Sequence, residues 1–155
     1  MPIEAGGNLL KKYGVGLFLS LVVLLLLFIV NAQIYRHVML LNTPIILLSL
    51  HVIVYKHLMP EKRYGAYFLF VLVVGASIFF SLPEYTYQQA QEDILDAYGQ
   101  DLKLTEQDNL PLDRYDSWNP FAPRWGYAFV GTVPSSQEHI SFLFIPDSGR
   151  ILEIA

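Results

Sequence analysis

The chain has 155 residues, which is enough for one domain or for two small parts. It is 54% hydrophobic and only 15% charged, and its lack of cysteine excludes disulfides and thiolate metal sites. Residues 1–83 carry six Lys/Arg and two acids (+4), whereas residues 84–155 carry four Lys/Arg and twelve acids (−8). The acidic second part excludes nucleic acid as an expected partner, because neutralising phosphates requires a basic face.

Three apolar stretches predict a transmembrane region over residues 1–83. The expected spans cover residues 13–32, 38–58 and 64–82, and the first is long enough for a hydrocarbon core of about 30 Å. Each is expected to be helical, because in lipid the backbone must satisfy its hydrogen bonds within the segment. The alternative for the first stretch is a cleaved signal peptide. Its apolar core is long for that role and two further spans follow, so we expect it to be retained.

The positive charges around these spans predict their orientation. Lys11 and Lys12 lie at the start of span one. Lys56, Lys62 and Arg63 lie between the last residues of span two and span three. Only Arg36 lies between spans one and two, and the chain turns acidic after span three. Because cytoplasmic loops are enriched in Lys and Arg, we expect a multi-pass cell-membrane protein with a cytoplasmic N-terminus and an extracytoplasmic C-terminal part. Membrane lipid is therefore one expected partner.

Two residues interrupt the apolar character of span two. Pro44 is expected in the first helical turn, where its missing N–H costs nothing, or at a kink if the helix starts earlier. His51 lies mid-span and is the intramembrane polar candidate, because ionisable groups in lipid are usually functional. The sequence leaves open a neutral histidine bonded to a neighbouring helix or a partner, and a cofactor or proton-relay role. Haem ligation within one chain would lack a second axial ligand, since His37 and His57 lie towards opposite ends of the span.

Small and aromatic residues mark faces and ends of the spans. Gly16 and Ser20 are four residues apart in span one, a spacing that lets two helices approach closely. Tyrosines lie at the predicted span boundaries, as they do in the interfacial belts of membrane proteins. These are Tyr13, Tyr55, Tyr64 and Tyr67.

The residues after Pro83 predict a small α+β domain over residues 84–155. Thr86 and Gln89 form a capping box at the start of an amphipathic helix that Gly99 ends. A short strand is expected near 102–105, followed by a long loop and by strands over 127–133 and 139–145. A third strand, "RILEI", follows a turn at 146–149. Asp147 and Gly149 are the structural turn residues, and Gly149 is expected at a position that favours a positive φ.

This pattern resembles the PepSY domain family over residues 85–155. The helix "TYQQAQEDILDAYG" matches the family's opening helix at Ala90, Ile94 and Gly99, and the ending "PDSGRILEI" matches its last hairpin. The resemblance implies one helix packed on an antiparallel β-meander. It also implies a non-catalytic extracytoplasmic module, which in several relatives is linked to peptidase inhibition or to control of membrane and wall-associated partners. The long aromatic loop and the three-span anchor depart from the family pattern.

No catalytic constellation is expected. Ser135, Ser136 and His139 lie close in sequence, but turn chemistry explains both serines and local clustering does not make a triad. The chain has no phosphate-binding loop, zinc motif or carboxylate-rich calcium loop. We therefore predict that the protein is not an enzyme and holds no metal and no cofactor.

The loop "SWNPFAPRW" is the expected partner-binding site. It brings together the residues that interfaces favour as anchors, namely Trp118, Phe121, Arg124 and Trp125. Two alternatives remain open, because the aromatic groups could join the small core or rest in the membrane interface. The predicted function is a small membrane protein whose outer module binds or regulates a protease, sensor or transporter. The alternatives are a redox or transport-complex subunit that uses His51, and a purely structural subunit.

Overall fold

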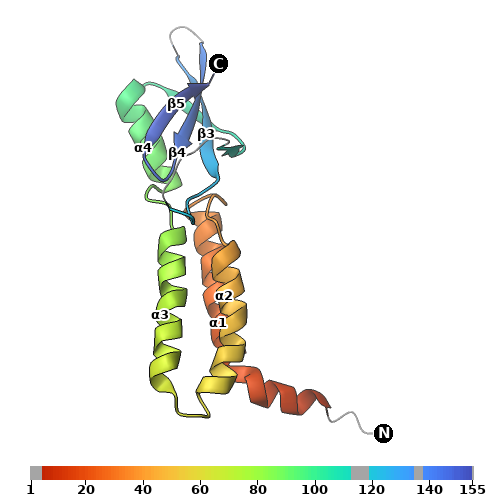
Figure 1. The fold of residues 1–155 in the computed structure, drawn as a ribbon. Coiled ribbons are helices and arrows are strands. Elements are labelled where there is room, and N and C mark those ends of the chain that lie inside the picture. Colours follow the sequence, from red (N-terminus) through yellow and green to blue (C-terminus); the bar gives the residue numbers. More distant parts are fainter. Residues whose placement is uncertain (1–4, 113–118, 135–137, 155) are drawn as a thin grey trace. The chain divides into compact units, whose positions relative to one another are not determined.

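The computed structural model describes residues 5–112, 119–134 and 138–154, with side chains from residue 14 onward. These residues form four helices, α1 Ala5–Gln33, α2 Asn42–Leu58, α3 Tyr64–Ser81 and α4 Tyr87–Tyr98. They also form five strands, β1 Lys103–Glu106, β2 Leu110–Pro111, β3 Trp125–Thr132, β4 His139–Ile145 and β5 Arg150–Ile154 (Figure 1). The chain divides into a helical unit, residues 5–29 and 41–79, and an α+β unit, residues 30–40 and 80–154.

Two of the described helices are long and apolar enough to cross a membrane, the Gly14–Gln33 part of α1 and α3. Their apolar side chains are largely exposed to the surroundings, as in Phe18, Phe68 and Phe79, which are each more than 60% exposed. A soluble protein would bury such groups, so this exposure fits a lipid environment. The helix α2 has 17 residues and is too short to qualify, so the described residues contain two candidate spans where the sequence predicted three.

The predicted start of span two is wrong. Residues 38–41 are not helical, and α2 begins at Asn42. The physical reason is that Val38 is buried in the core of the α+β unit, where it is 1% exposed, and so is unavailable to a lipid-facing helix. Pro44 then falls in the first turn of α2, which confirms the first-turn interpretation.

The sheet of the α+β unit is antiparallel, in the order β1-β3-β4-β5. The predicted meander is present, with Phe142 opposite Phe129 and Phe144 opposite Ile151. The short strand expected near 102–105 is β1, which pairs with β3 on the side away from β4. The segment predicted as one long loop also contains β2, where Leu110 and Pro111 pair with the first two residues of β3.

Helix α4 covers one face of this sheet (Figure 1). Ala90 and Ile94 are fully buried against aromatic side chains that alternate along the strands. Those side chains are Tyr127, Phe129, Phe142 and Phe144. The capping box of Thr86 and Gln89 is present, and the backbone N–H of Gly99 closes the helix on Leu95 O. The predicted α+β arrangement of one helix on a meander therefore describes this unit.

The core of the α+β unit also contains chain from the connection between α1 and α2. Val38 is part of the core, and Tyr35 packs against it. The backbone N–H of Tyr87, the first residue of α4, donates to Ile34 O at 3.1 Å. Residues 34–38 are therefore a structural part of the α+β unit, which no local sequence pattern indicated.

Candidate functional site

The imidazole of His51 lies in a polar cluster that joins all three helices of the helical unit. Its Nδ1 is 2.8 Å from Ser20 Oγ on α1, and its Nε2 is 2.8 Å from Tyr67 Oη on α3. Ser20 also donates from its hydroxyl to Leu48 O of α2, at 2.9 Å. His51 is only 7% exposed, so these bonds are shielded from competing solvent.

The direction of each bond in this cluster follows from the single hydrogen of the Ser20 hydroxyl. Because that hydrogen goes to Leu48 O, Ser20 Oγ accepts from His51, which places a proton on Nδ1. In a neutral imidazole Nε2 is then an acceptor, and it accepts from the Tyr67 hydroxyl. The result is one continuous chain of donors, from Tyr67 through His51 and Ser20 to Leu48 O.

This arrangement favours the interpretation of His51 as a neutral histidine bonded to neighbouring helices. A metal or haem iron would need one ring nitrogen free, and both are engaged. Phe70 stacks on the ring with centroids 6.3 Å apart, and Tyr55 lies at 6.1 Å. No cluster of three metal-ligating side chains occurs in the part of the chain that the structure describes.

Sequence patterns alone assign another role to each partner of His51. Ser20 fits a small residue at a helix contact, and Tyr67 fits an interfacial aromatic residue. The connection of residues 59–63 turns the chain back from α2 into α3, and a polar aromatic residue in the first turn of α3 was the signal that could have found Tyr67. Gly16 belongs to the same contact, since a β-carbon there would lie 3.0 Å from the Tyr55 ring. The small-residue spacing of Gly16 and Ser20 therefore marks where α2 contacts α1.

A second cluster, which the sequence did not reveal, lies in the α+β unit around Arg36. Its guanidinium is 3.4 Å from the Glu106 carboxylate on β1 and 5.1 Å from the centre of the Tyr87 ring. Burial, followed by the nearby Glu106 carboxylate, raises the pKa of the Tyr87 phenol to about 12. The phenol therefore stays protonated at neutral pH and can remain hydrogen-bonded to Glu106.

The backbone at this cluster is held in an unusual conformation. Arg36 and His37 have φ values of 45° and 68°, a left-handed region that costs a non-glycine residue about 1–2 kcal/mol. Two bonds to the buried Asn31 hold the segment, one from His37 N to its backbone oxygen and one from Met39 N to its side chain. These two bonds hold the C-terminal end of the segment, Ile34 O accepts from the Tyr87 N–H at its other end, and Val38 lies in the core.

The residues of the predicted partner-binding loop do not converge on one point. The ring of Phe121 stacks on Phe80, with centroids 6.4 Å apart. Arg124 is exposed, and Trp125, the first residue of β3, is 47% exposed opposite Pro111. Trp118 lies outside the described residues. Of the described members, Arg124 and Trp125 are the two that the unit presents to its surroundings.

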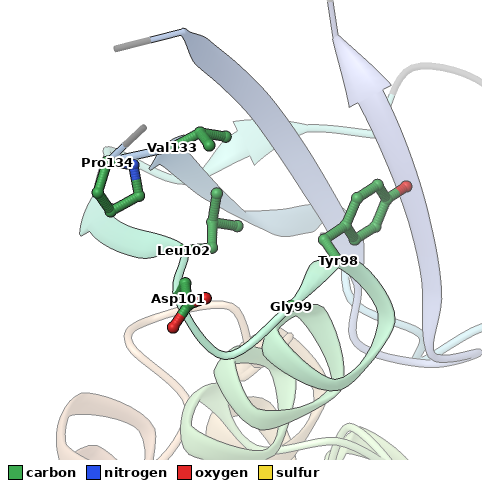
Figure 2. A pocket seen from close by; sticks show the side chains of 6 residues that line it. All are labelled: Tyr98, Gly99, Asp101, Leu102, Val133 and Pro134. Carbon is green, nitrogen blue, oxygen red and sulfur yellow. The ribbon is translucent and has the colours of Figure 1, made fainter. Parts of the chain in front are cut away.

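A hollow of about 440 Å³ lies at the C-terminal end of α4 (Figure 2). Its lining is mixed, with Leu102 and Val133 as apolar members and Asp101 as a carboxylate. The Tyr98 ring packs on Phe142 at 4.6 Å, and a hydrogen bond to Glu153 raises the pKa of its phenol. His139 lies elsewhere, at the start of β4, where its Nδ1 is 3.1 Å from Thr132 Oγ1. Ser135 and Ser136 lie outside the described residues, so the structure does not test that sequence cluster.

Comparisons with protein-family models, with curated proteins and with solved structures find no match. The resemblance to PepSY domains therefore rests on the residues themselves and remains a prediction. Of the residues that carry it, Ala90 and Ile94 lie on the buried side of α4, and Gly149 has a φ of 68° in the last turn.

Proposed function

We propose that this chain is a three-span membrane protein whose extracytoplasmic, PepSY-like domain binds and regulates a protein partner without catalysis of its own. The observation that carries the proposal is the burial of Val38 in the core of the α+β unit. That burial limits how many times the chain can cross the membrane. The number of crossings in turn determines on which side of the membrane the domain lies.

Val38 precedes α2, whereas the rest of its core follows α3. Two segments that share one hydrophobic core lie on the same side of a membrane. The chain between them must therefore cross an even number of times. Because α3 is long and apolar enough to cross, α2 crosses with it.

The length of α2 is compatible with this role. Seventeen residues rise about 25 Å, which is at the lower end of what a span requires. Its last turn carries Lys56 and His57, and the connection to α3 carries Lys62 and Arg63. These charges favour a cytoplasmic connection, which puts the α+β unit outside.

Partner binding is supported by what the α+β unit exposes. Trp125, 47% exposed, has Arg124 beside it in sequence and Pro111 opposite it, and Leu110 next to Pro111 is 37% exposed. Trp and Arg are among the residues most enriched as interface anchors. The PepSY resemblance implies the same kind of role, in control of a peptidase or of another membrane-associated protein.

Crosslinking in native membranes tests this function. The wild-type chain should yield a crosslinked adduct with one defined protein, and Trp125→Ala should lose that adduct while thermal unfolding stays unchanged. Phe68→Ala, which removes an equally exposed aromatic group from α3, is the matched control and should retain the adduct. Retention of the same adduct by Trp125→Ala would remove Trp125 as the anchor, and absence of any adduct from wild type would contradict the proposed function.

A further inference from the structure

Residues 119–122 form a tight turn that the side chain of Asn119 stabilises. The Ala122 N–H donates to Asn119 O at 3.1 Å, and the Phe121 N–H donates to Asn119 Oδ1 at 2.9 Å. Such turns favour asparagine at the first position and proline at the second, and here Pro120 occupies the second. The backbone that carries Phe121 is therefore held in one conformation.

The same turn is tied to the last turn of α3. The Asn119 side-chain amide donates to Phe80 O at 3.0 Å, and the Phe121 ring stacks on the Phe80 ring with planes 18° from parallel. Phe80 O is one of the last four carbonyls of α3, which receive no donor from within the helix. An unpaired carbonyl is costly in lipid, because no water is present to donate to it. Asn119 supplies the donor at the end of a candidate span.

The length of α3 places Phe80 at the edge of the hydrocarbon, a step that rests on the membrane location in the proposed function. The 18 residues of α3 extend about 27 Å, close to the hydrocarbon thickness of about 30 Å. Phe80 is the next-to-last residue of α3 and is 43% exposed. Because Phe121 stacks on Phe80, its ring lies at the same boundary.

The surroundings of the turn favour lipid over water. Among the described residues, the hydrophobic core of the α+β unit includes neither Phe80 nor Phe121. Residues 119–123, "NPFAP", carry no charge, although the segment 84–155 has twelve acids and four Lys/Arg. Acidic side chains are repelled by the negative surface of a membrane. An uncharged, aromatic turn is free of that repulsion.

We propose that residues 119–122 form a lipid-contact site, in which the Phe121 ring inserts between the acyl chains and the headgroups of a phospholipid bilayer. The site continues the exposed apolar surface at the end of α3, where Phe79 and Phe80 are 69% and 43% exposed. Phenylalanine is one of the residues that anchor protein segments at this boundary. The inference goes beyond the proposed partner role, because it assigns Phe121 to lipid and leaves Trp125 for the partner.

Fluorescence quenching by brominated lipid tests this site in the full chain. Phe121→Trp is combined with Trp118→Phe and Trp125→Phe, which replace both native tryptophans, and the protein is placed in phosphatidylcholine vesicles brominated near the headgroup. Its fluorescence should be quenched several-fold more than that of Tyr98→Trp in the same background. Tyr98 is the matched control, a 41% exposed aromatic residue at the far end of α4. Equal quenching of the two variants would overturn the inference.

A tryptophan in the middle of α3 separates this inference from the membrane location on which it rests. Leu72 is near the centre of α3 and is 52% exposed. Leu72→Trp in the same background should be quenched by phosphatidylcholine brominated near the ends of its acyl chains. Quenching of Leu72→Trp without quenching of Phe121→Trp would overturn the lipid-contact site alone. Absence of quenching from Leu72→Trp would overturn the membrane location and the site together.

Asn119→Ala tests whether the tie to α3 holds the ring in place. It removes the donor to Phe80 O and should reduce the quenching of Phe121→Trp several-fold. Asn109→Ala is the matched control, because the Asn109 amide also donates to a backbone oxygen, Arg36 O, in the same unit. It should leave the quenching unchanged. Full quenching in the presence of Asn119→Ala, or the same loss from both variants, would overturn the assignment of this turn to lipid.

Discussion

At the scale of single residues, Gly149 shows how one position determines a hairpin. It connects β4 to β5 with a φ of 68°, and its N–H donates to Ile145 O at 2.9 Å. A β-carbon at this position would also lie 2.8 Å from the ring of Tyr85. Tyr85 is itself held, because its N–H donates to Pro146 O. Glycine is therefore required here for two independent reasons.

Gly149→Val should destabilise the α+β unit by about 1–3 kcal/mol, through backbone strain and the collision with Tyr85. Circular dichroism of the full chain during chemical unfolding measures this loss. Ser148→Ala is the control, because Ser148 is exposed in the same turn and its side chain is not required to keep the turn. Equal stability of Gly149→Val and wild type would mean that the turn is not as described.

Ser20 provides a second test at the same scale. Ser20→Ala removes the acceptor of the His51 Nδ1 proton, and the helical unit should lose about 0.5–2 kcal/mol as a result. Thermal unfolding in detergent measures the change. Ser49→Ala is matched to it, since the Ser49 hydroxyl also donates to a backbone oxygen, Ile45 O, but from an exposed position. The same loss from both variants would contradict the donor chain through His51.

At the scale of elements, the connection between α1 and α2 forms part of the core of the α+β unit. It supplies Val38 to the core and an acceptor, Ile34 O, to the first residue of α4. The Arg36–Glu106 pair is about half exposed and contributes little by itself. Most of the stabilisation from this segment therefore comes from the buried valine.

Val38→Ala should lower the stability of the α+β unit by about 1–3 kcal/mol, because it leaves a cavity in a fully packed core. Ile34→Ala removes a larger side chain from the same segment, but that side chain is 43% exposed. Its loss should be much smaller, since its backbone bond to Tyr87 is kept. Unfolding monitored by near-ultraviolet circular dichroism separates the two, and a greater loss from Ile34→Ala would contradict the assignment of Val38 to the core.

At the scale of the whole molecule, the proposed three-span topology predicts a pattern of labelling. Single cysteines at residues 34 and 110 should react with an impermeant reagent from outside the cell, and one at residue 61 should not. The chain has no cysteine of its own to interfere. Residues 34 and 110 should agree because both belong to the α+β unit. Labelling of 34 together with 61 would mean that α2 does not cross, and the reverse of the predicted pattern would contradict the orientation.

The sequence by itself determined the features that depend on neighbours in the chain. The apolar runs predicted all three helices of residues 1–83, and the Thr86 and Gln89 pair predicted the start of α4. Gly149 predicted the last turn. Hydrophobic length, capping and backbone conformation are set within a few residues, and a single sequence contains all the information that they require.

Only the tertiary structure decided which distant segments share an environment. Val38 looked like the start of a span because it is apolar, and an apolar residue gains by burial in lipid or in a protein core alike. The sequence could not name the partners of His51, because Ser20 and Tyr67 lie 31 and 16 residues away. Strand β1 looked isolated until β3 gave it a partner 23 or more residues further on. Such contacts depend on how helices and strands pack together, because burial and hydrogen bonding reward proximity in space whatever the separation along the chain.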